Sequence, residues 1–312
     1  MNVINPKTLF IDIETTGLSP DVSAITVIGC CQTDGTITQW FNEDGLSQKK
    51  ILLRFLDFCS SFQKLVTFNG TTFDMPFIKA KIKEWKIEDS LKQMEHIDLY
   101  QKLRPYRHLL PLKTFRQKDF EHYFGISRKD NLSGKALVKL YQTFLETNNA
   151  KYKEQLLFHN KEDLTGLLKI SSLLCYPALK EGEFSIKNCQ LTKDFLNINI
   201  TLDHSWTQSV IFEKNQMSLD IQSCHGKLFC PLKNGMLFHY YPNPKDYYYL
   251  PEEDIILPKN MGSMVDKSSR IPADADHCYS KFKPKDTFLS NQDELFTFCK
   301  HNIYYLLRKD TR

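Results

Sequence analysis

Short apolar runs rich in β-branched residues dominate the start of the chain. Residues 7–13 read as a buried strand, and residues 23–33 predict a second one. Residues 35–41 predict a third strand, joined to the second through the turn signal Asp34-Gly35. The N-terminal pattern therefore predicts three strands, of which the second and third form an antiparallel hairpin.

After the third strand, apolar residues also recur at helical spacing. The predicted elements are a helix over 47–62 with Ser47 as N-cap, a strand over 64–68, a helix over 71–85 capped by Thr71 or Thr72, a strand over 95–100, and a mainly helical region over 101–176. Strand–helix–strand units following adjacent strands predict an α/β fold, a mixed five-stranded sheet flanked by helices.

The pattern changes at residues 175–183, after which strand-like stretches follow one another up to about residue 257. We expect a loop or meandering arm over 257–278 and a closing helix over 291–309. Residues 184–312 thus predict a smaller, mainly β module. Its many tyrosines and phenylalanines could stack nucleic-acid bases, but strands also need aromatic residues for packing. Because the module is slightly acidic, a structural or partner-docking role is favoured.

Composition is that of a globular protein. The chain has 312 residues, with 41% hydrophobic and 25% charged positions, which suits about two domains of ~100–200 residues. No apolar run approaches the ~20 residues of a membrane helix, and the N-terminus lacks the features of a signal peptide. The nine cysteines are scattered, which predicts reduced thiols and a cytoplasmic protein.

Two local features suggest ligands without deciding between alternatives. Cys224, His225 and Cys230 could begin a zinc site, yet no second ligand pair accompanies them. Ten basic residues and three acidic ones fall within 99–140. That excess suits a polyanion, although a solvated helical face would carry the same charges.

The first strand contains two acids, Asp12 and Glu14, which stand two residues apart and therefore face the same side. Buried carboxylates repel each other unless a cation binds them. The turn over 15–18 ends the strand, and sites on such sheets lie at the carboxyl ends of strands. The stretch DIETTGL therefore predicts an acidic site at the sheet edge.

Two further acids fall where they could join this pair. Asp74 lies in the first turn of a predicted helix, where the helix dipole alone would also favour an acid. Asp163 lies on the apolar stripe of another helix, with His159 one turn earlier on the same face. The alternative for His159 is a packed or surface histidine. Glu162 lies off this face, so we expect it in solvent.

Carboxylates on convergent elements require cations, and oxygen-rich sites select hard ions such as Mg²⁺ or Mn²⁺. Two such ions about 3.5–4 Å apart can stabilise the attacking and leaving oxygens of phosphodiester cleavage.

The order D-x-E, N-G-x-x-F-D and H-x-x-x-D resembles the DEDD superfamily of 3′–5′ exonucleases, which has a ribonuclease H-like fold. The resemblance is closer to the bacterial YprB-like group of predicted exonucleases. The matching stretches are FIDIETTGL, FNGTTFDMPFI, DLYQKLRP, HNKEDLTGLL and residues 112–141.

The resemblance implies an exonuclease domain over residues 1–178. It implies that Asp12, Glu14, Asp74 and Asp163 are metal ligands for two divalent cations, Mg²⁺ or Mn²⁺. It implies nucleic acid as the partner, with activated water attacking the terminal phosphodiester. It also implies that His159 orients or deprotonates that water.

One position departs from that superfamily. Its third motif has Tyr separated from the Asp by three residues, or His separated by four. Here His159 is separated from Asp163 by three residues, so it stands at the tyrosine position. Both side chains still share a helix face, and a neutral imidazole near pH 7 could accept the proton.

The same resemblance suggests contacts to the substrate. Thr15 and Leu18 would contact the terminal nucleotide, and Asn69 and Phe73 would shape the same pocket, with core packing as the alternative for Phe73. Asp98 ends a predicted strand and is expected to act either as a capping acid or in support of the site.

Exposed basic side chains could contact the rest of the substrate. Lys113, Arg116 and Lys118 could grip the phosphate backbone, although an ordinary exposed helix has the same spacing.

The leading hypothesis is a hydrolase of phosphodiester bonds, a metal-dependent 3′–5′ exonuclease. It would act on single-stranded or frayed ends of DNA or RNA, with no membrane partner. One alternative is a catalytically silent module on the same fold that binds nucleic acid or protein. Another is a structure-specific endonuclease. The presence of all four acids favours an enzyme.

Overall fold

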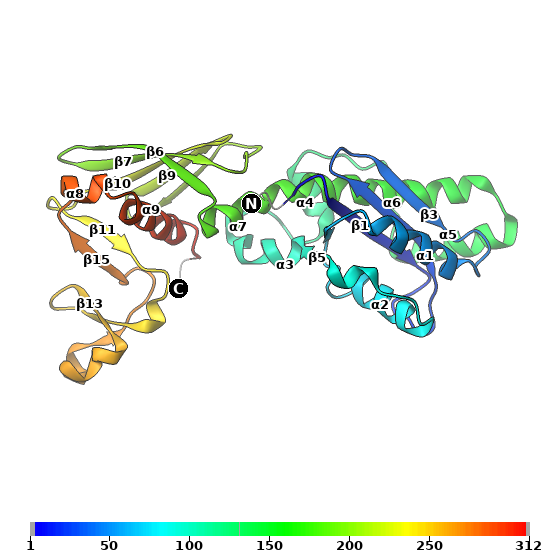
Figure 1. Cartoon of the computed structure of the whole chain (residues 1–312), viewed down its shortest axis with the longest axis horizontal. Helices are drawn as coiled ribbons and strands as arrows, with labels where there is room; N and C mark the ends of the chain where they lie inside the picture. The colour runs from blue at the N-terminus through cyan, green and yellow to red at the C-terminus, as the bar shows by residue number, and fades with distance from the viewer. Residues whose placement is uncertain (1–3, 131, 310–312) are drawn as a thin grey trace. The chain divides into compact units, whose positions relative to one another are not determined.

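The structure is a computed structural model that describes residues 4–130 and 132–309. The chain divides into two compact units, residues 2–174 and residues 175–312. Figure 1 shows the first unit from blue to green and the second from green to red.

A mixed five-stranded sheet with strand order β3-β2-β1-β4-β5 forms the first unit. Its strands are β1 (Thr8–Thr15), β2 (Ile25–Gln32), β3 (Ile37–Phe41), β4 (Lys64–Thr67) and β5 (Glu95–Asp98). The pairs β1–β2 and β2–β3 are antiparallel, whereas β1–β4 and β4–β5 are parallel. The predicted mixed sheet flanked by helices is confirmed.

The helices of this unit lie between and after the strands. They are α1 (Gln48–Cys59), α2 (Asp74–Glu84), α3 (Leu99–Leu103), α4 (Gln117–Tyr123), α5 (Gly134–Thr147) and α6 (Ala150–Ile170), with short 3-10 turns over Ser90–Gln93, Arg104–Leu109 and Ser171–Leu174. The long helix α6, green in Figure 1, runs along the sheet.

The two faces of β1 have different surroundings, because alternate side chains of a strand point to opposite sides. Leu9, Ile11 and Ile13 are buried in one core with residues of α1 and α2. Asp12 and Glu14 face the other side, where α6 packs against β1, β2 and β3. The same strand therefore supplies a hydrophobic core on one face and a polar pair on the other.

Two asparagines make the tight connection between α5 and α6. Asn148 ends α5 in the left-handed conformation with φ of 50°, and the Asn149 side chain accepts a hydrogen bond from the backbone N–H of Lys151. Asparagine tolerates the first conformation and is a favoured N-cap. The connection lets α6 fold back along α5 and onto the sheet.

The second unit is mainly β, with helices at its two ends. Its strands are β6 (Phe184–Leu191), β7 (Phe195–Leu202), β8 (Val210–Lys214), β9 (Met217–Gln222), β10 (His225–Pro231), β11 (Leu237–Tyr240), β12 (Tyr247–Leu250), β13 (Ile255–Pro258), β14 (Ile271–Pro272) and β15 (Tyr279–Phe282). Its helices are α7 (Cys175–Glu181), α8 (Asp286–Ser290) and α9 (Gln292–Leu306), with 3-10 turns over Pro244–Asp246, Lys259–Met264 and Lys267–Ser269.

Five of these strands form an antiparallel sheet of order β6-β7-β10-β9-β8. The pairs β11-β15 and the set β13-β12-β14 form two smaller sheets. Among the described residues, no helix is both long enough and apolar enough to cross a membrane.

Some local predictions are wrong. The helix predicted over 71–85 begins at Asp74, and neither threonine caps it, because Thr72 donates its hydroxyl hydrogen bond to the carbonyl of Asn69. Ser47 does occupy the N-cap position of α1, as predicted, but its side chain bonds Asp44 instead of the helix.

The second unit also differs from the sequence patterns in two places. The segment predicted as a loop over 257–278 contains β14, which pairs with β12. Of the zinc candidates on β10, His225 is exposed and Cys230 is buried. Their separation by five residues places these two side chains on opposite faces of the strand.

Asp98 supports the first unit at the end of β5, where its side chain is 5% exposed. It accepts hydrogen bonds from the backbone N–H groups of Tyr100 and Gln101, which start α3, and of Asn69 and Thr71, which precede α2. The capping role expected for this acid is confirmed. One carboxylate thus fixes two helix entries at once.

We predict that Asp98→Ala lowers the free energy of unfolding by roughly 1–3 kcal/mol, because several backbone donors lose their partner. Urea unfolding of the full chain, monitored by tryptophan fluorescence, measures this loss of stability. Trp40 and Trp85 report on the first unit because they lie in it. Asp57→Ala removes an exposed acid on α1 and serves as the control, expected to change stability by less than about 0.5 kcal/mol. Equal stabilities of the two variants would contradict the prediction.

Candidate active site

Asp74 joins the acids of β1 through a backbone contact. It is the first residue of α2 and is 6% exposed. Its Oδ1 accepts a hydrogen bond from the backbone N–H of Ile13 at 3.3 Å. Because Ile13 stands between Asp12 and Glu14 in the sequence, this bond draws the start of α2 to the acidic end of β1.

The turn before α2 explains the Asn-Gly pair of the second motif. Asn69 has a φ of 61°, a left-handed conformation that asparagine tolerates. A Cβ on Gly70 would lie 2.4 Å from Oγ1 of Thr67, so this position has no room for a side chain. The motif therefore directs the chain from β4 into α2 with Asp74 at the helix start.

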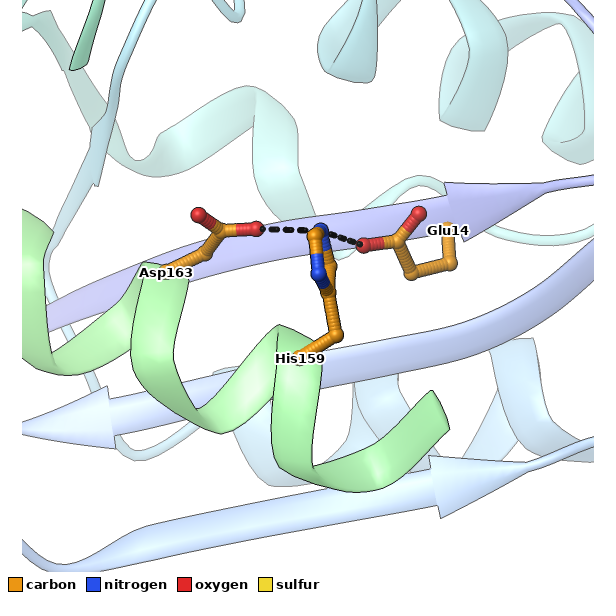
Figure 2. Close-up of side chains that lie close together, drawn as sticks. All are labelled: Glu14, His159 and Asp163. Atoms are coloured by element: carbon orange, nitrogen blue, oxygen red, sulfur yellow. Dashed lines mark ion pairs between the residues drawn. The ribbon is translucent and has the colours of Figure 1, made fainter. Parts of the chain in front are cut away.

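The helix α6 brings His159 and Asp163 to Glu14. The Nε2 atom of His159 lies 3.1 Å from Oδ2 of Asp163 and 3.6 Å from Oε1 of Glu14. Figure 2 shows the imidazole ring between these two carboxylates. Ligand atoms of the three side chains lie within 4.8 Å of one another, close enough to hold a metal ion.

The other ring nitrogen of His159 is held by Asp130, whose carboxylate contacts Nδ1. The backbone N–H groups of Lys129 and Asp130 donate to the two carboxylate oxygens of Glu162 at 3.0 and 2.9 Å. The expectation that Glu162 is simply solvated is therefore wrong. It anchors the segment that carries Asp130 to α6.

Arg128 is a further residue of the site, and the sequence patterns did not single it out. Its guanidinium contacts the carboxylates of Asp163 and Glu121, with an Nη2 to Oε1 distance of 2.6 Å to Glu121. The Arg128 side chain is only 8% exposed. One member of the basic segment over 99–140 thus neutralises buried acids instead of facing solvent.

An open cavity of about 540 Å³ adjoins the acidic end of β1. Glu14, Thr15, Leu18 and Phe73 line it, together with the Lys135 side of α5. Thr15, Leu18 and Phe73, which are predicted to contact substrate, therefore line the same cavity.

The other residues that are predicted to contact substrate lie outside this cavity. Asn69 does not line this cavity. Lys113, Arg116 and Lys118 are exposed, the first two just before α4 and Lys118 in its first turn.

Comparison with known proteins gives the family of the first unit. The family model of the RNase_H superfamily matches residues 9–175. This chain belongs to the RNase_H superfamily. The uncharacterized protein MJ0365 of Methanocaldococcus jannaschii is 28% identical over 173 residues, which cover 53% of this chain and 93% of that protein.

Two solved structures resemble this RNase_H superfamily chain more distantly. The family B DNA polymerase of Pyrobaculum calidifontis has a TM-score of 0.49 and 11% identity, covering 96% of this chain. The chain spans 46% of that polymerase. A structure described as the apo form of the nuclease has a TM-score of 0.37 and 17% identity, covering 56% of this chain and 74% of the other. Neither likeness bears on activity.

Burial and mutual repulsion disfavour charge on three acids of this RNase_H superfamily site. Burial raises the pKa of Asp12 well above its usual range, with further increases from the charges of Asp163 and Glu14. Burial also raises the pKa of Glu14 to about 8 and that of Asp74 to about 7. The charge of Asp163 contributes to all three shifts, so these acids lie within electrostatic reach of one another.

The pKa values of His159 and Asp163 shift in the directions that favour an ion pair between them. Burial alone would lower the pKa of His159, but the hydrogen bond and charge of Asp163, aided by Glu14 and Asp130, raise it to about 9. Burial alone would raise the pKa of Asp163, whereas His159 and Arg128 hold it below its usual value. In this arrangement the neighbouring carboxylates favour a protonated imidazole, whereas the expected role as a base requires a neutral one.

The donor set fits a hard divalent cation. Carboxylate oxygens predominate, and burial with negative neighbours raises the pKa values of Asp12, Glu14 and Asp74, so added positive charge would stabilise their ionised forms. Such oxygen-rich sites suit Mg²⁺ or Mn²⁺. The two basic side chains described above, His159 and Arg128, both contact Asp163.

We predict that the chain in chelator is more stable near pH 5 than near pH 8. Glu14 and Asp74 keep protons in the folded state that they lose when unfolded, so stability falls as the pH rises through these pKa values. His159 acts in the same direction, because its pKa is raised to about 9 and its contribution is lost as the pH rises through that value. The lowered pKa of Asp163 contributes stability at neutral pH, and that contribution is lost only at acidic pH.

Thermal unfolding across this pH range measures the effect, and Mn²⁺ should raise the melting temperature more at about pH 8 than at about pH 5. The variant Asp12→Asn, which removes one of the repelling charges, should show a flatter profile. A higher melting temperature at pH 8 than at pH 5 in chelator would contradict this reading of the site.

Proposed function

We propose that the chain is a divalent-metal-dependent 3′–5′ exonuclease that hydrolyses phosphodiester bonds of nucleic acid. The carrying observation is that D-x-E, N-G-x-x-F-D and H-x-x-x-D supply acids from β1, α2 and α6 within electrostatic reach of one another. Membership of the RNase_H superfamily supports nucleic-acid hydrolysis. The resemblance to the DEDD superfamily and its YprB-like group suggests the exonuclease direction.

In this proposal Asp12, Glu14, Asp74 and Asp163 hold two Mg²⁺ or Mn²⁺ ions. Bound ions would supply activation of the attacking water and neutralisation of developing charge. The protein's own contribution is to hold these carboxylates on three rigid elements and to limit their contact with water. Arg128 and His159 stabilise Asp163 by contacts on its two carboxylate oxygens.

His159 is proposed to orient the attacking water or accept its proton. Its Nε2 faces Glu14 and Asp163, while Asp130 holds Nδ1 and so fixes the ring. The hydrogen bond and charge of Asp163, with the charge of Glu14, raise the pKa of His159 to about 9. Once those charges are neutralised, the pKa of His159 falls, and a neutral imidazole becomes available as a base.

The cavity beside Glu14 is proposed to receive the terminal nucleotide. Thr15, Leu18 and Phe73 line it, and Lys135 adds positive charge. A cavity of about 540 Å³ lies within the ordinary range for a small ligand, which favours single-stranded or frayed ends over an intact duplex.

Other parts of the chain have supporting roles in this proposal. Lys113, Arg116 and Lys118 are exposed and would contact the phosphate backbone, and Asn69 would shape the substrate pocket through its turn. Residues 1–178 would form the exonuclease domain. Residues 184–312 would serve a structural or partner-docking role.

We predict that Asp12→Asn abolishes metal-dependent hydrolysis of labelled single-stranded DNA and RNA without lowering the melting temperature. Turnover should fall by at least about a thousand-fold, because metal ions contribute several kcal/mol of transition-state stabilisation. The fold is spared because the substitution removes a repelled, buried charge. Asp57→Asn, at an exposed position on α1, is the matched control.

The same assay includes circular substrates, which have no ends. Hydrolysis of linear oligomers alone supports an exonuclease, whereas cleavage of circles would indicate an endonuclease. If neither DNA nor RNA is hydrolysed with Mg²⁺ or Mn²⁺, the result would contradict the enzyme proposal and favour a silent binding module.

For His159→Ala we predict a loss of turnover of about 10²–10⁴-fold with only a modest loss of Mn²⁺ affinity. His159→Tyr should retain more turnover than His159→Ala, because exonucleases that the chain resembles carry tyrosine at this position. Single-turnover rates and Mn²⁺ titrations measure the two effects separately. Near-wild-type turnover of His159→Ala would refute a role in proton transfer.

A further inference from the structure

Asn160 is a buried amide between α6 and β1. Its side chain is 0% exposed. The Nδ2 atom donates hydrogen bonds to the Asp12 carboxylate, at 2.8 Å from Oδ2, and to the Asp12 backbone carbonyl at 3.2 Å. A single side chain of α6 therefore holds both the carboxylate and the backbone of Asp12.

Gln39 fixes which end of the Asn160 amide faces Asp12. Its Nε2 donates to Oδ1 of Asn160 at 2.7 Å and to the backbone carbonyl of Leu157 at 2.8 Å. A backbone carbonyl can only accept, so it selects the NH₂ end of Gln39. The NH₂ group of Gln39 therefore faces the carbonyl oxygen of Asn160. The NH₂ group of Asn160 then faces Asp12 and donates to it.

Reversal of the Asn160 amide would create two repulsive contacts. Its NH₂ would meet the NH₂ of Gln39, and its carbonyl oxygen would meet the Asp12 carboxylate. A fixed backbone carbonyl of α6 thus determines the orientation of a side chain that contacts Asp12. Amide orientations are assigned from such networks, and here every member has a complementary partner.

The sheet leaves space for this network at Gly29. Gly29 lies opposite Asp12 in the β1–β2 pairing. A Cβ at that position would lie 1.9 Å from Oδ1 of Asn160 and 2.8 Å from a methyl carbon of Leu164. Absence of a side chain on β2 therefore lets the Asn160 amide reach β1.

From this network we infer that Asn160 is a positioning residue, which holds the Asp12 carboxylate by Oδ2 and presents Oδ1 to a divalent cation, with Gln39 setting its polarity. Among the described residues, the network contains no other hydrogen bond to the Asp12 carboxylate. The inference rests on the proposed function, because it requires a cation at Asp12. It gives a role to Asn160, a variable position of the H-x-x-x-D motif, and to Gln39, which lies outside the acid motifs.

Hydrogen-bonded partners behind a metal ligand restrict its rotation before the metal binds. Without Asn160, the Asp12 carboxylate would lose its hydrogen bond at Oδ2 and could rotate away from the cation. Loss of such partners typically lowers metal affinity or activity by about 10–100-fold. The effect should therefore appear in cation binding itself, before any substrate is added.

The test compares Asn160→Ala, Gln39→Ala and the control Asn42→Ala in the full chain. Asn42 is equally buried, at 0% exposure, but its amide bonds the carbonyl of Ile25 and the backbone N–H of Ser47, away from the acids. Electron paramagnetic resonance of free Mn²⁺ gives the dissociation constant of each folded variant. Thermal unfolding reports stability, and kinetics with a single-stranded oligomer separate kcat from KM.

We expect Asn160→Ala to weaken Mn²⁺ binding by about 10–100-fold and to lower kcat at saturating Mn²⁺ more than it changes KM. Gln39→Ala should shift both quantities in the same direction by less, since it frees the amide without deleting it. Asn42→Ala should lower the melting temperature but leave Mn²⁺ affinity unchanged.

Several outcomes would overturn the inference. Wild-type Mn²⁺ affinity in folded Asn160→Ala would do so while leaving the proposed function intact. If Asn160→Ala does not fold, unchanged affinity in Gln39→Ala would overturn it instead. An equal loss of affinity in Asn42→Ala would assign the effect to stability alone. Failure of the wild-type chain to bind Mn²⁺ would overturn the proposed metal function together with the inference.

Discussion

Repulsion among buried carboxylates is the constraint on which the first unit depends. Asp12, Glu14 and Asp74 are desolvated near Asp163, and their pKa values rise accordingly. The repulsion is partly offset because two basic side chains contact Asp163. They are His159, one turn earlier on α6, and Arg128. A divalent cation would relieve the same repulsion at the other acids, so the arrangement that limits stability also creates affinity for metal.

Much of this arrangement follows from local sequence. The strand period places Asp12 and Glu14 on one face, and the helical period places His159 and Asp163 together. The five-stranded sheet is predictable because its strands carry short apolar runs separated by turn signals or helices. Asn69-Gly70 marks the turn after β4, although the sequence alone did not reveal that α2 begins only at Asp74.

The partners of the acids could not be predicted, because they come from distant parts of the chain. Arg128 reads as one more cation in a basic segment, yet it is buried against Asp163 and Glu121. Glu162 reads as a solvated acid, yet it binds the backbone that carries Asp130. The contact of Asn160 with Asp12 spans 148 positions. Such contacts depend on how α6 packs on the sheet, which no local period specifies.

The central claim is that the acidic end of β1 is a divalent-cation site. X-ray diffraction at the manganese absorption edge, from crystals of the full chain grown with Mn²⁺, tests it most directly. The account predicts anomalous density among the carboxylates of Asp12, Glu14, Asp74 and Asp163. Anomalous density absent from these carboxylates, with Mn²⁺ bound elsewhere or not at all, would contradict it.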